Sequence, residues 1–275
     1  MSLVVIICVF NLVSFQAPLL RYALLVSNLT EFDGVIQIIS LQVLQFCLLA
    51  MLLLILSSIS VFVMKSVTAV LLICNALGLY FMVTYGIEID RWMIANIFNT
   101  DSRETAELLH ISIVPYVVFL GLIPALFIML VGVRAPRRIW RLAGSVGSIA
   151  VLLLWIMATS FTVLWYDKHA SRMGSKILPW SYIVNTGRHF NRSAMDNRMQ
   201  VLLPKPSFIA ESSSSKDVVV LVVGEAARAD RFSALGYGRN TNPFTASQNL
   251  AAFPIGLSCA TNTISATACI LTHEG

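Results

Sequence analysis

The chain has 275 residues, of which 57% are hydrophobic and 12% are charged, and its formal net charge is +5. Soluble domains carry about 25% charged residues, so this composition argues against an ordinary soluble protein and is typical of a membrane protein. The sequence has no dense basic patch with interleaved aromatic residues, so nucleic-acid binding is not expected. Residues 1–166 contain 8 Lys/Arg and 7 Asp/Glu, whereas residues 167–275 contain 11 and 7. We therefore predict a membrane half, 1–166, followed by a water-facing half.

Five apolar windows in the first half are free of Asp, Glu, Lys and Arg. They cover residues 1–20, 34–64, 66–87, 108–133 and 142–166. A membrane-spanning helix needs about 20 apolar residues, which each window provides. The first window is interrupted by Asn11 and Pro18, but it lacks the basic start and the cleavage site of a signal peptide, so we interpret it as a span. The sequence thus predicts an α-helical membrane domain with five transmembrane helices.

Basic residues indicate how these spans are oriented. The segment "RAPRRIWR" between the last two windows holds Arg134, Arg137, Arg138 and Arg141 and no acid. Lys65, at the predicted tight turn between the second and third windows, belongs to the same side. By the positive-inside rule this side is cytoplasmic, which leaves the 86–107 loop and everything after Tyr166 outside. We expect a multi-pass protein of a bacterial inner membrane, with its second half in the periplasm.

The connector at 167–216 mixes charged residues with Ile, Leu, Trp, Tyr and Phe. This mixture suits short amphipathic helices lying at the membrane interface, and it equally suits a solvated linker. The serine run "ESSSSKD" at 211–217 has little to bury and indicates a flexible link. A new folded unit is expected from residue 217.

A run of β-branched residues, "VVVLVV" at 218–223, opens this unit. Such a run is typical of a strand buried on both faces, as in a parallel sheet. Glu225 follows at the carboxyl end of the predicted strand, where open α/β sheets bind their ligands. A lone buried carboxylate is costly. Glu225 therefore needs a partner, which is either a divalent metal, Arg228, or the N-terminus of the next helix.

The segment "SCATNTISATAC" at 258–269 is dense in hydroxyl groups between two cysteines, Cys259 and Cys269. In an oxidising compartment a disulfide between them would pin the segment. A pinned hydroxyl beside a metal is an activated nucleophile, whereas the alternative is a polar surface loop with two unrelated cysteines. The residues alone do not select among the hydroxyls of Thr261, Thr263, Ser265 and Thr267.

Both motifs, "VVGEAARADRFSALGYGRNTNP" and the run around Thr263, resemble those of the phosphoethanolamine transferases that modify lipid A. These enzymes belong to the alkaline phosphatase/sulfatase superfamily. The resemblance implies five spans, interfacial helices and a periplasmic α/β/α domain. It also implies that Glu225 is a zinc ligand, that Thr263 is the metal-bound nucleophile, and that Cys259 and Cys269 form a disulfide.

A third match lies in the outside loop, where Asn96, Thr100 and Glu104 recur at intervals of four. In a helix these residues share one face. The family carries the same pattern in this loop, where it resembles a binding site for the lipid headgroup. Without the resemblance, the pattern reads as the polar face of a loop.

The resemblance implies a two-step transfer. Thr263 takes phosphoethanolamine from phosphatidylethanolamine and passes it to lipid A or to an inner-core (Kdo) sugar of lipopolysaccharide. The added ammonium lowers the negative charge of the outer surface and weakens its attraction for cationic peptides such as polymyxin. The alternatives are a glycerol-phosphate transferase of the same superfamily and a non-catalytic membrane fragment.

We place the transmembrane domain at 1–166, the interfacial helices and linker at 167–216, and an incomplete sulfatase-like catalytic domain at 217–275. The family's other metal ligands, an Asp-His pair and a further His, follow well after the nucleophile segment. Glu225 and Thr263 are too few to hold a catalytic zinc, which takes three protein ligands. We therefore expect these 275 residues to be inactive by themselves.

Overall fold

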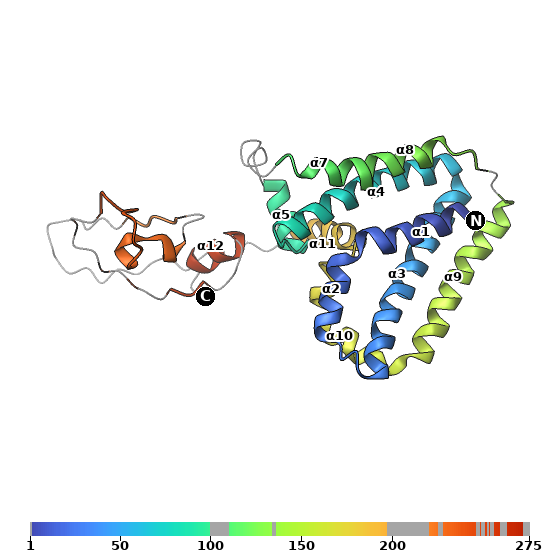
Figure 1. Cartoon of the computed structure of the whole chain (residues 1–275), viewed down its shortest axis with the longest axis horizontal. Helices are drawn as coiled ribbons and strands as arrows, with labels where there is room; N and C mark the ends of the chain where they lie inside the picture. Colours follow the sequence, from blue (N-terminus) through green and yellow to red (C-terminus); the bar gives the residue numbers. More distant parts are fainter. Residues whose placement is uncertain are drawn as a thin grey trace. The chain divides into compact units, whose positions relative to one another are not determined.

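The computed structural model describes residues 2–99, 110–133, 136–196, 220–224, 228–245, 248, 251, 253, 256–258 and 263–271. The chain divides into two compact units, Met1–Met199 and Gln200–Gly275. The first unit is built of helices, coloured blue to yellow in Figure 1. The second carries short helical segments among irregular stretches.

The helices of the first unit include four to five candidate spans, compared with the five that the sequence predicts. Four stretches are long and apolar enough to cross a membrane, and a bent helix pair makes a fifth if it counts as one span. The unit contains α1 Ser2–Phe15, α2 Ala17–Val26, α3 Phe32–Ile59, α4 Val61–Thr84, α5 Arg91–Asn99, α7 Ile113–Pro115, the π-helix η1 Tyr116–Leu122, α8 Ile123–Leu130, α9 Arg138–Ala158, the 3-10 turn η2 Ser160–Thr162, α10 Val163–Gly174 and α11 Trp180–Asp196. The stretch from α7 to α8 forms one span, and α3, α4 and α9 form the others.

The bent pair is α1 and α2, whose axes meet at 62°. Pro18 lies in the first turn of α2, where its missing N–H costs nothing because that turn has no partner for it. Gln16 sits at the break and is fully buried. Asn11, which we expected to interrupt the first window, instead lies within α1 and is buried.

The turn between α3 and α4 lies at Ser60, five residues before the predicted turn at Lys65. The Ser60 hydroxyl accepts a hydrogen bond from the backbone N–H of Phe62, 3.2 Å away, and so caps α4. Lys65 lies inside α4, where its ammonium donates to the carbonyl oxygens of Val131 at 2.6 Å and Met129 at 3.2 Å. The prediction of its position was therefore wrong, although Lys65 does lie at the end of the unit where α8 stops.

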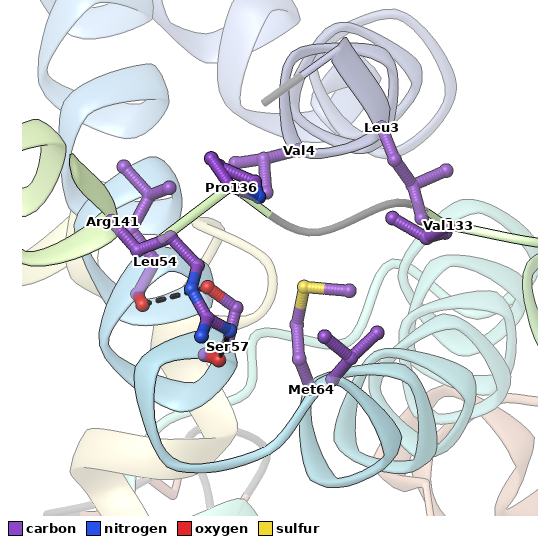
Figure 2. A pocket seen from close by; sticks show the side chains of 9 residues that line it. Leu3, Val4, Leu54, Ser57, Met64, Val133, Pro136 and Arg141 are labelled. Atoms are coloured by element: carbon purple, nitrogen blue, oxygen red, sulfur yellow. Dashed lines mark hydrogen bonds between the residues drawn. The ribbon is translucent and has the colours of Figure 1, made fainter. Parts of the chain in front are cut away.

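Arg141 lies at this same end. Its Nη1 donates to the carbonyl of Ser57, one of the last four residues of α3, and Figure 2 shows the two residues side by side on one side of a pocket, with Val133 across it. The final carbonyls of a helix lack partners within the helix and carry partial negative charge. Lys65 and Arg141, the basic residues that the charge pattern placed on one side, thus donate hydrogen bonds to carbonyls at the C-terminal ends of α8 and α3.

Helix α9 begins at Arg138, four residues before the predicted window, and ends at Ala158, eight residues before the window does. It packs along α3, while α4 packs along η1 and α8 (Figure 1). The indole Nε1 of Trp155 donates to Ser40 Oγ at 2.8 Å across the first of these contacts. At the second contact, a Cβ added to Gly121 would come within 3.2 Å of Ile73 Cα, so the glycine permits close approach.

The connector after α9 is helical over Val163–Gly174 and Trp180–Asp196. The first of these helices runs across the position at which we placed the end of the transmembrane domain. Between them, the side chain of Leu178 is fully buried in the main core of the unit. These residues therefore form helices fixed to the first unit, and their place relative to the membrane surface stays a prediction.

The second unit contains the 3-10 turns η3 Ala229–Arg231 and η4 Ser233–Leu235 and the helix α12 Thr263–Leu271. The buried strand predicted at 218–223 is not seen in its described part, since 220–224 are irregular and Val222 is 83% exposed. A strand needs neighbouring strands to accept and donate its backbone hydrogen bonds, and the described residues contain none. The α/β/α domain therefore stays a prediction.

Candidate functional site

The candidate nucleophile Thr263 lies in α12 and is exposed. Thr267 lies a turn further along α12 and is half-buried. Of these two hydroxyl-bearing residues, Thr263 is the more exposed, and its role as the nucleophile stays a prediction.

Cys269 lies in α12, six residues after Thr263, and is disulfide-bonded. Cys259 lies outside the described residues, so its pairing with Cys269 stays a prediction. The cysteines of the membrane spans, Cys8, Cys47 and Cys74, are free thiols. A disulfide at Cys269 restrains the helix that carries Thr263.

Glu225, the candidate metal ligand, lies outside the described residues. Arg228, one of its alternative partners, bonds Asp230, with Nε and Nη2 donating to the two carboxylate oxygens at 3.0 and 2.8 Å. The hydrogen bond and charge of Arg228 lower the pKa of Asp230. Within the described parts of the chain, no group of three His, Cys, Asp or Glu side chains lies close enough to hold a metal.

The segment that follows Arg228 is held by short-range hydrogen bonds. Thr241 Oγ1 donates to the carbonyl of Arg231 at 2.6 Å and accepts from the backbone N–H of Ser233 at 2.9 Å. Gly236 has a φ of +99°, a left-handed conformation that favours glycine. The "DRFSALGYGRNT" part of the motif is thus a compact turn whose threonine ties its two ends together.

Asn96, the first residue of the predicted headgroup site, is half-buried in α5. Its position on a helix is what the four-residue spacing requires. Thr100 and Glu104 lie outside the described residues, so whether the three share one face stays a prediction.

Comparison with known proteins identifies the family. The model of the family "Phosphoethanolamine transferase EptA/EptB" matches residues 46–194, more than half of the chain. The chain belongs to this phosphoethanolamine transferase family. A second family model, "Sulfatase", matches residues 217–274.

Several family members resemble the chain over most of its length. Phosphoethanolamine transferase EptA of Helicobacter pylori is 30% identical over 263 residues, which cover 94% of this chain and 48% of that protein. Phosphatidylethanolamine transferase Mcr-1 of Escherichia coli is 30% identical over 271 residues, or 90% and 50%. The chain spans about half the length of these relatives.

A solved structure has the same fold. It is the integral membrane lipooligosaccharide phosphoethanolamine transferase A (EptA) from Neisseria meningitidis, with a TM-score of 0.76 at 24% identity. The match covers 95% of this chain and 50% of that one. The helical membrane unit is therefore the fold of this family.

Proposed function

We propose that the protein transfers phosphoethanolamine from phosphatidylethanolamine to lipid A or to a Kdo sugar of the inner core. The observation that carries this proposal is the order of two family matches in one chain. The transferase match covers the membrane unit, and the sulfatase match covers the segment that holds Glu225 and Thr263. This reaction needs two parts. One is a membrane domain that admits a lipid, and the other is a domain from a superfamily that transfers phosphoryl and sulfuryl groups.

In the first step, Thr263 Oγ1 attacks the phosphorus of the donor. A new P–O bond forms to Thr263, and the P–O bond to diacylglycerol breaks, so diacylglycerol leaves with the proton. In the second step an acceptor oxygen attacks the same phosphorus, and Thr263 recovers its hydroxyl. The exposed position of Thr263 in α12 supports this role, because both lipids must reach its oxygen.

Glu225 and Thr263 would hold a divalent metal, which we propose to be zinc. A carboxylate and a hydroxyl are both oxygen donors, the class of ligand through which Asp and Glu bind zinc, and Thr263 is an exposed residue. When bound, the metal supplies positive charge that favours the threonine alkoxide and stabilises the phosphoryl oxygens. Asn96, Thr100 and Glu104 would bind the donor headgroup, with the carboxylate facing the ammonium.

The proposed location is the bacterial inner membrane, with the arginine-rich loop in the cytoplasm and residues 217–275 in the periplasm. Lys65 and Arg141 lie at the end of the unit where α3 and α8 finish. Helix α5 follows the opposite end of α4, and α10 follows the opposite end of α9. The positive-inside rule then places Asn96 on the periplasmic side, as a donor site there requires. Transfer in this compartment would reduce binding of polymyxin.

Substitutions at Thr263, Glu225 and Thr267 test the proposal. The protein is expressed from its own gene in cells fed labelled phosphatidylethanolamine, and label on lipid A or core sugars is followed by mass spectrometry. We expect Thr263→Ala and Glu225→Ala to abolish transfer, because the nucleophile or a metal ligand is lost. Thr267→Ala, a matched change on the same helix, should retain transfer. Full transfer by the Thr263→Ala protein would overturn the site.

A further inference from the structure

A polar pocket of about 350 Å³ lies between the start of α5, the end of α10 and α11. Arg91 of α5 and Arg188 of α11 both line it, and so do the hydroxyl-bearing residues Ser171 and Ser175. Asp90 is the one acid among the described lining residues. The lining therefore carries a net positive charge together with hydroxyl groups, a combination that suits an anion.

Arg188 is held in place by a buried neighbour. Asn185 is 6% exposed, and its Nδ2 donates to the carbonyl of Ile89 at 2.8 Å. Its Oδ1 in turn accepts from Arg188 Nη1 at 3.5 Å. Asn185 thus ties α11 to the segment before α5, and its Oδ1 lies within long hydrogen-bond reach of the Arg188 guanidinium at the pocket.

Arg91 is positioned in a different way. Its guanidinium lies over the ring of Trp92, 4.2 Å from the ring centre. Stacking uses the flat face of a guanidinium, whereas phosphate oxygens bind the N–H groups along its edge. Two arginines that are already oriented lose little conformational freedom on binding, so they favour a phosphate, which they can contact through paired hydrogen bonds.

The neighbouring acids have partners of their own. Asp90 Oδ1 accepts the backbone N–H of Met93 at 2.8 Å and so caps α5. Glu88 forms an ion pair with Lys176 and accepts the Ser175 hydroxyl at 3.0 Å. Partial burial raises the pKa of Glu88, but the hydrogen bond and charge of Lys176 outweigh it, and the pKa lies below its ordinary value. The negative charges of Asp90 and Glu88 are therefore stabilised by groups other than Arg91 and Arg188.

Exposed aromatic rings on the same two helices place the pocket near lipid headgroups. Phe98 of α5 stacks on His189 of α11, with ring centres 5.6 Å apart, and meets Phe190 edge-on at 5.3 Å. Both phenylalanines are 56% exposed. Aromatic rings gather at the boundary between membrane and water. A cationic pocket on the helices that carry such rings is suited to a lipid rather than to a soluble anion.

We propose that this pocket binds the phosphate monoester of an anionic lipid. A monoester carries nearly two negative charges near neutral pH, which matches the two arginines, whereas a diester carries one. If the proposed function is correct, such a monoester is what a lipid A acceptor presents, and the pocket would hold the acceptor beside helix α5, which also carries Asn96. That last assignment rests on the proposed function, whereas the binding itself does not.

The test is a binding measurement that requires no transfer. The purified protein is placed in phosphatidylcholine nanodiscs with a small fraction of phosphatidic acid, and retained lipid is counted by native mass spectrometry. We expect Arg91→Gln and Arg188→Gln each to weaken retention about tenfold and the double variant to reduce it to background. Lys168→Gln removes a charge from α10 outside the pocket lining and should leave retention unchanged.

Three further arms complete the test. The double variant Arg91→Lys and Arg188→Lys keeps both charges and should retain part of the binding, which separates loss of the site from loss of folding. Phosphatidylglycerol, a diester, should bind more weakly than phosphatidic acid, and equal binding would overturn the monoester assignment. Binding of inorganic phosphate without phosphatidic acid would overturn the lipid assignment. Equal retention of phosphatidic acid by the wild-type protein and the glutamine double variant would overturn the site itself.

Discussion

Replacing Gln16 with leucine removes a buried polar junction from the membrane unit. Gln16 Nε2 donates to the carbonyl of Leu178 at 2.6 Å and to Asn11 Oδ1 at 3.0 Å. Gln16 Oε1 accepts from Gln45 Nε2 at 2.9 Å. One fully buried side chain therefore joins α1, α3 and the segment between α10 and α11. Leucine has nearly the same volume, so the change removes hydrogen bonds without leaving a large cavity.

The loss can be estimated from these three bonds. Hydrogen bonds between helices inside a membrane contribute about 0.6 kcal/mol each on average, or about 2 kcal/mol for three. Each buried polar group left without a partner costs about 1–3 kcal/mol. Three such groups remain after the change, in Leu178, Asn11 and Gln45. The three net hydrogen bonds give about 2 kcal/mol and the three unpartnered groups about 3–9 kcal/mol, so we expect the free energy of unfolding to fall by at least about 2 kcal/mol, with relaxation and water entry favouring the lower value.

The assay is reversible unfolding in mixed micelles of dodecyl maltoside and sodium dodecyl sulfate, followed by circular dichroism. Gln42→Leu is the matched control, because Gln42 Nε2 is buried in α3 with no hydrogen-bond partner among the described residues. We expect Gln42→Leu to be neutral or stabilising. If both leucine variants unfold at the same detergent ratio as the wild-type protein, the Gln16 junction contributes nothing and the reasoning is refuted.

Three other predictions concern the end caps, the disulfide and the topology. Lys65→Met should lower stability by about 1–3 kcal/mol because the carbonyls of Met129 and Val131, at the C-terminal end of α8, lose their donor, while Lys65→Arg should retain most of it; equal stability of all three proteins would contradict the cap. Peptide mapping without reductant should give one linked pair, Cys259 with Cys269, and two free thiols in exported protein would rule the pairing out. Alkaline phosphatase fused after Ser215 should be active; an inactive fusion, with an active cytoplasmic reporter at the same point, would reverse the topology.

The spans could be predicted from the sequence because the length of an apolar run is set by the thickness of the membrane. Their ends could not be predicted from charge-free windows. Ser60 starts α4 through a hydroxyl cap, and Arg138 and Arg141 belong to α9 although both lie outside its window. Hydropathy counts a capping serine as a neutral residue and an arginine as a break, whereas a long basic side chain can reach helix carbonyls or water from within a helix.

The candidate site was predictable only where local motifs carry it. The segment 258–269 marks a hydroxyl-rich site, but Thr263 was selected within it only by the family resemblance, and its role stays a prediction. The pocket of Arg91 and Arg188 could not be predicted, because these residues are 97 positions apart and neither lies in a recognisable motif. They meet through the packing of α5 on α11, which no local pattern encodes. The one sequence signal for this pocket is the three-residue spacing of Asn185 and Arg188, which puts both on one face of a helix.

The central claim is that phosphoethanolamine is carried on Thr263. The most direct measurement is peptide mass mapping of the protein, expressed from its own gene, after incubation with labelled phosphatidylethanolamine in the absence of acceptor. We predict that the label appears as phosphoethanolamine on Thr263 and on no other residue of 258–269, and that added lipid A removes it. Labelled lipid A formed with no modified threonine, or modification of Thr267 in place of Thr263, would contradict the claim.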